Sequence, residues 1–173
     1  MRGRRSSAPV GGARGKAMVD THTLYFEDIE AGRIFVSTGR TVTEADSTMF
    51  CMLSGDWNPL HCDEEFAKTT PFGRRVVGGI FGITLLTGMF TRWGVFELSA
   101  LAMLSLDNWT FRAPILIGDT LHVRMTIKSK RLTSKPGRGV IERFFEIVNQ
   151  DGSVVQSGDS AMLMACRPEP ATA

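Results

Sequence analysis

Residues 76–91 read Val-Val-Gly-Gly-Ile-Phe-Gly-Ile-Thr-Leu-Leu-Thr-Gly-Met-Phe-Thr, a run of sixteen residues without a charged side chain. Large apolar side chains fall on every side of a helical projection of this run. The run is shorter than the ~20 apolar residues that a membrane-spanning helix needs. The pattern therefore predicts a helix that is buried on all faces within a folded domain. Gly79, Gly82 and Gly88 would let neighbouring elements pack closely against it.

Four segments rich in strand-forming residues follow this helix, at residues 100–112, 119–132, 140–149 and 154–166. Turn-forming stretches separate them, and in the second segment apolar residues from Leu121 to Ile127 alternate with polar ones. The prediction is an α+β fold in which an antiparallel sheet curls around one long, central, buried helix. Because a single sheet of this kind leaves apolar edges or faces uncovered, we expect a homodimer at least.

The segment before the buried helix predicts one strand and two helices. Residues 33–43 are rich in β-branched side chains and predict the strand. Thr43 and Asp46 have the spacing of a capping box, and apolar residues recur at helical spacing until Gly55. Asp63 can cap a second, short helix over residues 64–68. The residues between these two helices are expected to form a stiff loop.

Charge is distributed unevenly along the chain. Residues 1–17 contain five basic side chains and no acidic one, which leaves 15 basic against 18 acidic residues, a balance of −3, in the remainder. This balance argues against nucleic-acid binding by the body of the protein. Residues 1–17 are interpreted as a disordered basic leader or as a mis-called start with Met18 as the true first residue; a transit peptide has a similar composition. Residues 18–170 are expected to form a single domain.

Three cysteines without a motif spacing are typical of a protein in a reducing cytoplasm. The 173 residues, 43% of them hydrophobic, can build one core without a disulfide or a metal. We therefore expect a cytoplasmic protein that does not interact with a membrane.

The loop Ser-Gly-Asp-Trp-Asn-Pro-Leu-His-Cys-Asp, residues 54–63, carries the densest set of proton-transferring groups in the chain. Asp56 and His61 could hold one water between a carboxylate and an imidazole, as general acid/base chemistry requires. Turn capping by Asp56 and Asn58, with His61 as a structural histidine, explains the same pattern. A metal site is the third reading, but the spacing matches neither a calcium loop nor a zinc finger, so no metal is expected.

The chain resembles the MaoC-like (R)-specific enoyl-CoA hydratases, which have the hotdog fold. The resemblance covers residues 24–166 and is most specific in Leu-Ser-Gly-Asp-Trp-Asn-Pro-Leu-His, residues 53–61. Further support comes from Phe-Ala-Lys-Thr-Thr at 66–70, Arg-Val-Val-Gly-Gly at 75–79 and Phe-Arg-Ala-Pro-Ile-Leu-Ile-Gly-Asp at 111–119.

The resemblance implies a lyase reaction, the reversible hydration of a trans-2-enoyl-CoA to an (R)-3-hydroxyacyl-CoA. Asp56 and His61 would hold the attacking water, with His61 taking its proton and Asp56 supplying the proton to C2. The backbone N–H of Gly79, at the start of the helix, would stabilise the thioester oxyanion. Asn58 would fix the loop, and Thr87 is a candidate near the site.

The chain departs from the family pattern at Gly78, where the family usually has histidine, and this leaves the acyl specificity open. Coenzyme A is expected as part of the substrate, with no tightly bound cofactor. Its phosphates could be neutralised, across a dimer, by a basic cluster around one hairpin: Lys128, Lys130, Arg131, Lys135, Arg138 and Arg143.

Three alternatives stay open beside the hydratase. A hotdog thioesterase generally carries its carboxylate on the central helix, and residues 76–91 contain none. A dehydratase acting on carrier-protein thioesters would use the same loop. A non-catalytic hotdog that binds acyl groups would not need Asp56 or His61 for its role.

Overall fold

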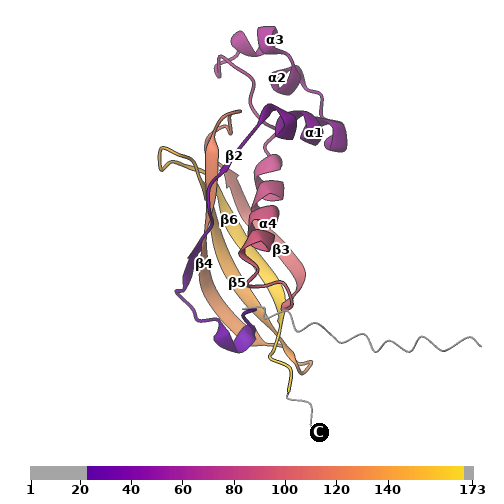
Figure 1. Cartoon of the computed structure of the whole chain (residues 1–173), viewed down its shortest axis with the longest axis vertical. Helices are drawn as coiled ribbons and strands as arrows, with labels where there is room; N and C mark the ends of the chain where they lie inside the picture. Colours follow the sequence, from indigo (N-terminus) through magenta and orange to yellow (C-terminus); the bar gives the residue numbers. More distant parts are fainter. Residues whose placement is uncertain (1–22, 170–173) are drawn as a thin grey trace, which may run out of the picture.

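The computed structural model describes residues 23–169, so the predictions for residues 1–17 and for the exact ends of the domain lie outside the described residues. An antiparallel sheet has the strand order β1-β4-β5-β6-β3, and β2 pairs with β4 beside β1. The helix α4 (Phe81–Trp93) lies along its concave face (Figure 1). The strands are β1 Ile34–Val36, β2 Arg40–Thr41, β3 Ala100–Phe111, β4 Thr120–Leu132, β5 Arg138–Val148 and β6 Val154–Ala165. The predicted architecture and its four long strands are confirmed, the strands to within two residues at each end.

The single strand predicted over residues 33–43 is wrong, because the segment is broken into β1 and β2. The break lies at Ser37, whose hydroxyl oxygen accepts a hydrogen bond of 2.8 Å from the backbone N–H of Val123. A side-chain oxygen thus takes the place of a strand carbonyl. The pairing with β4 then resumes one residue out of register, with Val36 opposite Arg124 but Arg40 opposite Leu121.

The central helix begins five residues later than predicted. Val77 donates a backbone hydrogen bond of 2.9 Å to Ile115, and Val76 forms a bridge with Leu116, so this segment lies extended against the connection from β3 to β4. The helix starts at Phe81 and continues to Trp93.

The prediction that this helix is buried on all faces is also wrong for the single chain. Phe81, Leu85, Leu86 and Met89 are buried against the sheet. The opposite face carries small residues that are exposed, namely Thr84, Thr87, Gly88 and Thr91. The helix therefore buries mainly the face that carries its large side chains.

Three further helices form a group at one end of the sheet (Figure 1): α1 Glu44–Ser54, α2 Pro59–Cys62 and α3 Glu64–Lys68; a single 3-10 turn, η1, spans Phe26–Asp28. The predicted capping box of α1 is confirmed, since Asp46 N–H donates to the Thr43 hydroxyl and Thr43 N–H donates to the Asp46 carboxylate. Asp63 caps α3, as predicted. Within residues 23–169, no helix is long and apolar enough to cross a membrane.

Candidate active site

The loop after α1 is shaped by two caps in succession. Gly55 ends α1 with a positive φ of 73°, a conformation that glycine adopts without strain. Asn58 then accepts a hydrogen bond of 2.9 Å from Leu60 N–H and caps α2, with Pro59 at the first helical position. The prediction of an irregular loop is therefore wrong at residues 59–62, where one helical turn carries His61.

His61 is held by its Nδ1 atom, which lies 2.7 Å from the carbonyl oxygen of Val76. Because a carbonyl oxygen can only accept, Nδ1 carries the proton, and Nε2 of the neutral ring is left with a free lone pair. Nε2 lies 3.6 Å from Oδ2 of Asp56. The His61 side chain is 12% exposed and that of Asp56 is 53% exposed, so the pair spans from the protein interior to solvent.

A cavity of about 360 Å³ opens beside His61, and Gly79, Phe111 and Gln156 line it. At Gly79 a Cβ atom would lie 3.2 Å from the ring of Phe111, so the glycine allows this close approach. The sequence predicted Gly79 in the first turn of the helix. The residue lies before the helix instead, because α4 begins at Phe81. In the described part of the chain, the Gly79 N–H has no hydrogen-bond acceptor.

Gln156 is a residue of this site that the sequence analysis missed. Its Nε2 donates to the Gly79 carbonyl oxygen at 2.9 Å, and its Oε1 accepts from the indole N–H of Trp109 at 3.1 Å. Gln156 is 1% exposed, on the inward face of β6. Several polar residues occur in β6, so the sequence carried no signal that singled out Gln156. These bonds fix the peptide group between Gly79 and Ile80, next to the one that carries the Gly79 N–H.

Gly78, where the family usually has histidine, lies beside both Phe50 and His61. A Cβ atom at this position would stand 2.9 Å from the ring of Phe50 and 3.9 Å from Nε2 of His61. Phe50 also packs edge-on against Phe81, with ring centroids 5.8 Å apart. An aromatic ring from α1 thus fills the space that a side chain at position 78 would enter.

An arginine connects the helices that carry the loop. The guanidinium of Arg75 donates two bonds to the Glu44 carboxylate, at 2.7 and 2.9 Å, and one of 2.8 Å to Glu64. Bonding to Arg75 holds the pKa of Glu44 below its ordinary value, and the two carboxylates raise the pKa of Arg75. Through these bonds Arg75, the residue directly before Val76, is joined to both α1 and α3.

Thr87 does not reach this cavity. It lies two turns further along α4, donates its hydroxyl to the Thr84 carbonyl at 2.7 Å, and lines a different cavity.

The predicted basic cluster is not one exposed surface. Lys128 pairs with Asp159 at 2.7 Å, and Lys130 donates to the carbonyls of Phe26 and Glu27. Arg143 was predicted to belong to this cluster but is 4% exposed, because its position faces inward on β5. Arg131, Lys135 and Arg138 remain near the β4–β5 turn, at the end of the sheet away from α1, α2 and α3 (Figure 1).

The distance from this turn to the site follows from the register of the sheet. Arg138 pairs with Ala165 on β6, nine residues beyond Gln156, which is ~30 Å along a strand. Within one chain the cluster therefore does not reach the cavity of His61. Within residues 23–169, no group of three His, Cys, Asp or Glu side chains could hold a metal ion.

A sheet wrapped around one helix defines the class: this is the hotdog fold. Residues 30–143 match the MaoC like domain. The chain belongs to the MaoC-like dehydratase family.

Named relatives agree with this assignment. The protein is 41% identical over 106 residues to "Protein MaoC" of Klebsiella aerogenes, a match that covers 61% of this chain and 31% of that protein. It is 32% identical over 108 residues to the 3-hydroxybutyryl-CoA dehydratase of Methylorubrum extorquens, covering 62% of this chain and 66% of the relative. The chain thus spans less than two thirds of the length of these two relatives.

A solved structure supports the fold. The MaoC-like dehydratase from Rhodospirillum rubrum superimposes with a TM-score of 0.72 at 25% identity, over 84% of this chain and 99% of that one.

Proposed function

We propose that this protein is a hydro-lyase that reversibly adds water to a trans-2-enoyl-CoA and forms the (R)-3-hydroxyacyl-CoA. The observation that carries the proposal is the His61 ring, which is fixed by Val76, lines the same cavity as Gly79 and has its free Nε2 3.6 Å from Asp56. The relative named 3-hydroxybutyryl-CoA dehydratase supports a coenzyme A thioester as substrate.

The separation of His61 and Asp56 suits a bridging water. The 3.6 Å between Nε2 and Oδ2 is longer than a direct hydrogen bond, and a water beside both atoms can bond to each. As the water oxygen adds to C3, Nε2 takes one proton from it, and Asp56, which starts the cycle as the carboxylic acid, gives its proton to C2. Transfer of the proton from His61 to Asp56 then restores the pair, so that one water is added and no proton is gained or lost.

The thioester oxygen gains negative charge as water adds to C3, and the Gly79 N–H is the proposed donor to it. Support comes from the free N–H of Gly79 and from Gln156, which holds the carbonyl of the same residue. A preorganised donor of this kind lowers the barrier because it is already oriented when the charge develops.

A thioesterase on the same fold is the second candidate. Thioesterases of the hotdog class generally use a carboxylate on the central helix, and α4 has no Asp or Glu between Phe81 and Trp93. This composition favours water addition over thioester hydrolysis.

Incubation with crotonyl-CoA tests the proposal. We expect loss of the absorbance of the conjugated thioester without release of free thiol. Release of thiol with the double bond intact would establish the thioesterase instead. The same measurement with a carrier-protein thioester decides between the two carriers.

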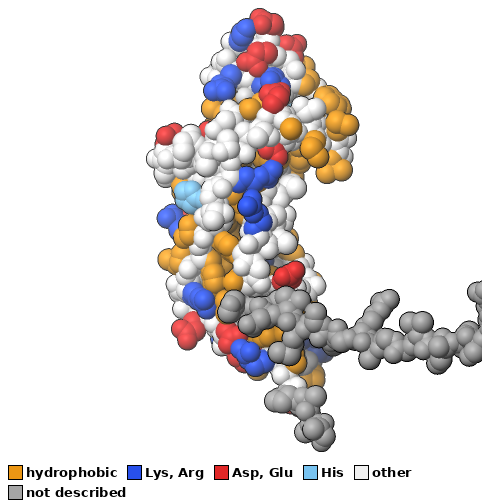
Figure 2. Space-filling view, viewed as in Figure 1, with side chains coloured by type: hydrophobic (Ala, Val, Ile, Leu, Met, Phe, Trp, Pro, Cys, Tyr) orange, Lys and Arg blue, Asp and Glu red, His pale blue; other side chains and the backbone are white. Residues whose placement is uncertain are grey.

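We also propose that two copies associate through β3. This strand is the edge of the sheet, twelve residues long, and its exposed side chains include Leu101, Met103, Leu104 and Leu106. A long apolar edge strand is a template for pairing with another strand. Hydrophobic side chains also gather over α1 (Figure 2), where Met49, Met52 and Leu53 are exposed.

A second copy is also what the proposed role of the basic residues requires. Because Arg131, Lys135 and Arg138 lie ~30 Å from His61 along the sheet of one chain, they could meet the phosphates of coenzyme A only at the site of another copy. Their part in substrate binding therefore depends on the proposed dimer.

A further inference from the structure

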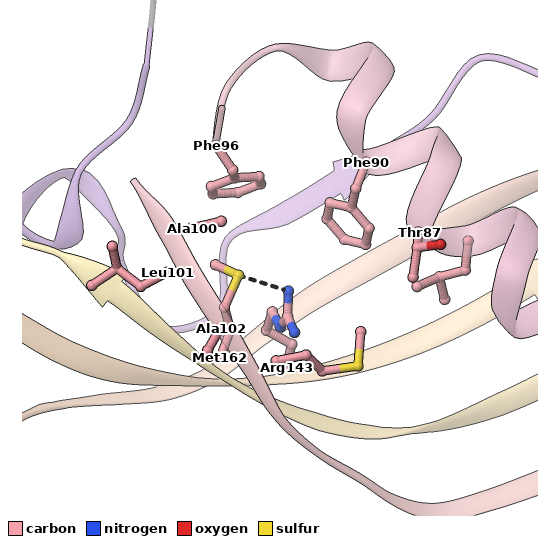
Figure 3. Close-up of a pocket in the computed structure, with 10 residues that line it drawn as sticks. Thr87, Phe90, Phe96, Ala100, Leu101, Ala102, Arg143 and Met162 are labelled. Carbon is pink, nitrogen blue, oxygen red and sulfur yellow. Dashed lines mark hydrogen bonds between the residues drawn. The ribbon is translucent and has the colours of Figure 1, made fainter. Parts of the chain in front are cut away.

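Arg143 places a guanidinium group inside the hydrophobic core. It is 4% exposed, and its neighbours on the inward face of β5, Ile141 and Phe145, are fully buried. Nη2 donates to the Ser160 hydroxyl at 2.9 Å, and Nη1 meets only the sulfur of Met162 at 3.3 Å (Figure 3). Among the residues that the structure describes, none accepts a hydrogen bond from the Nε atom.

No carboxylate within residues 23–169 pairs with this guanidinium. The rings of Phe90 and Phe145 lie 5.6 and 5.1 Å from its central carbon and stabilise the charge in part. They do not accept the hydrogen bond that Nε has to offer. Burial lowers the pKa of Arg143 to about 10, so the side chain still carries its charge at neutral pH. A buried charge without a counter-ion is costly, and an anionic ligand would remove that cost.

The cavity beside Arg143 has the character expected of a binding site for a hydrocarbon chain. It measures about 250 Å³ and lies between α4 and β3 (Figure 3). Its walls are apolar apart from Thr87 and Arg143, and include Leu86, Phe90 and Met103. The shared property of a fitting ligand is therefore an apolar chain that ends in an anion.

This cavity lies further along the same helix and sheet as the cavity of His61. On β6, Gln156 lines the cavity of His61 and Ser160 bonds to Arg143. These two residues are four positions apart, which is ~13 Å along a strand. Trp109 lies against Gly158, midway between them, where any Cβ atom would clash with the indole. The indole therefore lies between the two cavities along β6.

We infer that the substrate is an enoyl thioester whose acyl chain ends in a second carboxylate, and that Arg143 binds this carboxylate. The inference rests on the proposed function and names its substrate class. The unpaired Nε and the sulfur-facing Nη1 supply the donors, and the planar guanidinium suits a carboxylate. Since three bonds of an extended chain span at most ~3.6 Å, ~13 Å corresponds to about eleven bonds and a chain of about ten carbons.

The test compares pairs of 2-enoyl-CoA thioesters with equal carbon number, one ending in methyl and the other in carboxylate, from four to twelve carbons. We expect the wild-type protein to prefer the carboxylate-ended member, most strongly near ten carbons. Arg143→Met should lower kcat/KM for that member about 30-fold or more and leave the methyl-ended member within a few-fold. Arg143→Lys keeps the charge but not the planar donor set, so its kcat/KM for the carboxylate-ended member should lie between the values of the wild type and of Arg143→Met.

Arg124→Met is the matched control. Arg124 lies on the neighbouring strand β4, pairs with Glu146 at 2.6 Å and is 44% exposed, so its loss should not change the preference. Binding of the saturated acyl-CoA thioesters, measured by calorimetry, is the second readout and does not require turnover. A wild-type protein that fails to hydrate any enoyl thioester but binds the carboxylate-ended one more tightly, through Arg143, refutes the proposed function alone.

Equal binding of the methyl-ended and carboxylate-ended thioesters overturns the inference. An equal loss of kcat/KM for both thioesters in Arg143→Met also overturns it. An Arg143→Met variant that sediments as a smaller species than the wild type also overturns it, because the guanidinium would then serve contacts between copies.

Discussion

The Nδ1 atom of His61 donates a 2.7 Å hydrogen bond to the carbonyl oxygen of Val76, and this bond joins the acid–base loop to the segment that leads into α4. The backbone N–H of Val77, the next residue, donates a hydrogen bond to the carbonyl of Ile115 in the connection between β3 and β4. The orientation of the imidazole is therefore set by the core of the domain. A base that is oriented in this way before substrate arrives needs little reorganisation during the reaction.

The first prediction concerns this pair. His61→Gln and Asp56→Asn should each lower kcat for crotonyl-CoA by ~10²–10⁴-fold, because each removes a positioned proton-transfer group. The two losses should not add in the double variant, since the residues act on one water. His122→Gln, the same change at a half-buried strand position, serves as the control with unchanged rate. Full activity in both single variants, with folding unchanged, would show that the site lies elsewhere.

The second prediction concerns two glycines of α4. A Cβ atom at Gly82 would stand 2.5 Å from Oε1 of Gln156, so Gly82→Ala must displace the side chain that holds the Gly79 carbonyl. We expect kcat to fall by up to ~10²-fold, as for a small misplacement of a catalytic group. A Cβ atom at Gly88 meets nothing within 4 Å, so Gly88→Ala should keep the rate and stabilise the helix by ~0.5–1 kcal/mol. Equal rates in the two variants would show that Gln156 does not position Gly79 for the reaction.

The third prediction concerns the edge of the sheet. Leu104→Lys introduces a charge on β3, where Leu104 is 50% exposed, and should convert the proposed dimer to monomers in sedimentation experiments. Leu132→Lys, at the end of β4 and similarly exposed, should leave the assembly intact. A wild-type protein that sediments as a monomer, or a Leu104→Lys variant that stays dimeric, would exclude β3 as the interface.

The fourth prediction concerns acid pH. Bonding to Arg75 lowers the pKa of Glu44 below its ordinary value of 4.5, so the pair stabilises the fold above that value and loses its contribution as the pH falls through the lowered pKa. Arg75→Gln should therefore reduce the melting temperature at pH 7 only slightly, since exposed pairs contribute ~0–1 kcal/mol each. The difference between wild type and variant should shrink below pH 4.5. A difference that is constant from pH 7 to pH 3 would contradict this assignment.

The fifth prediction separates stability from function at Arg143. Because burial lowers its pKa to about 10, the charged form destabilises the fold at neutral pH, and this cost is relieved only as the pH rises through about 10. Arg143→Met should stabilise the protein at pH 7 by ~1–4 kcal/mol, measured by denaturant unfolding. A less stable Arg143→Met variant would mean that the rings of Phe90 and Phe145 already compensate the charge.

The sequence by itself determined the elements whose signals are local. The caps at Thr43 and Asp63 are single side chains that bond to nearby N–H groups, and the alternation along β4 follows from the pleat of one strand. The proximity of Asp56 and His61 is also local, because Asp56 lies just before the cap of the turn that carries His61.

The tertiary structure alone decided what depends on distant parts of the chain. Ile115 holds Val77 extended and so delays the helix, and the inward position of Gln156 became meaningful only when β6 was placed beneath Gly79. Arg143 looked like one of several basic residues on a hairpin until the register of β5 turned it into the core. Backbone caps act over three or four residues, whereas the burial of a charge is set by which strands lie beside it, and this is why the sequence indicated the acid and the base while only the fold revealed the cation.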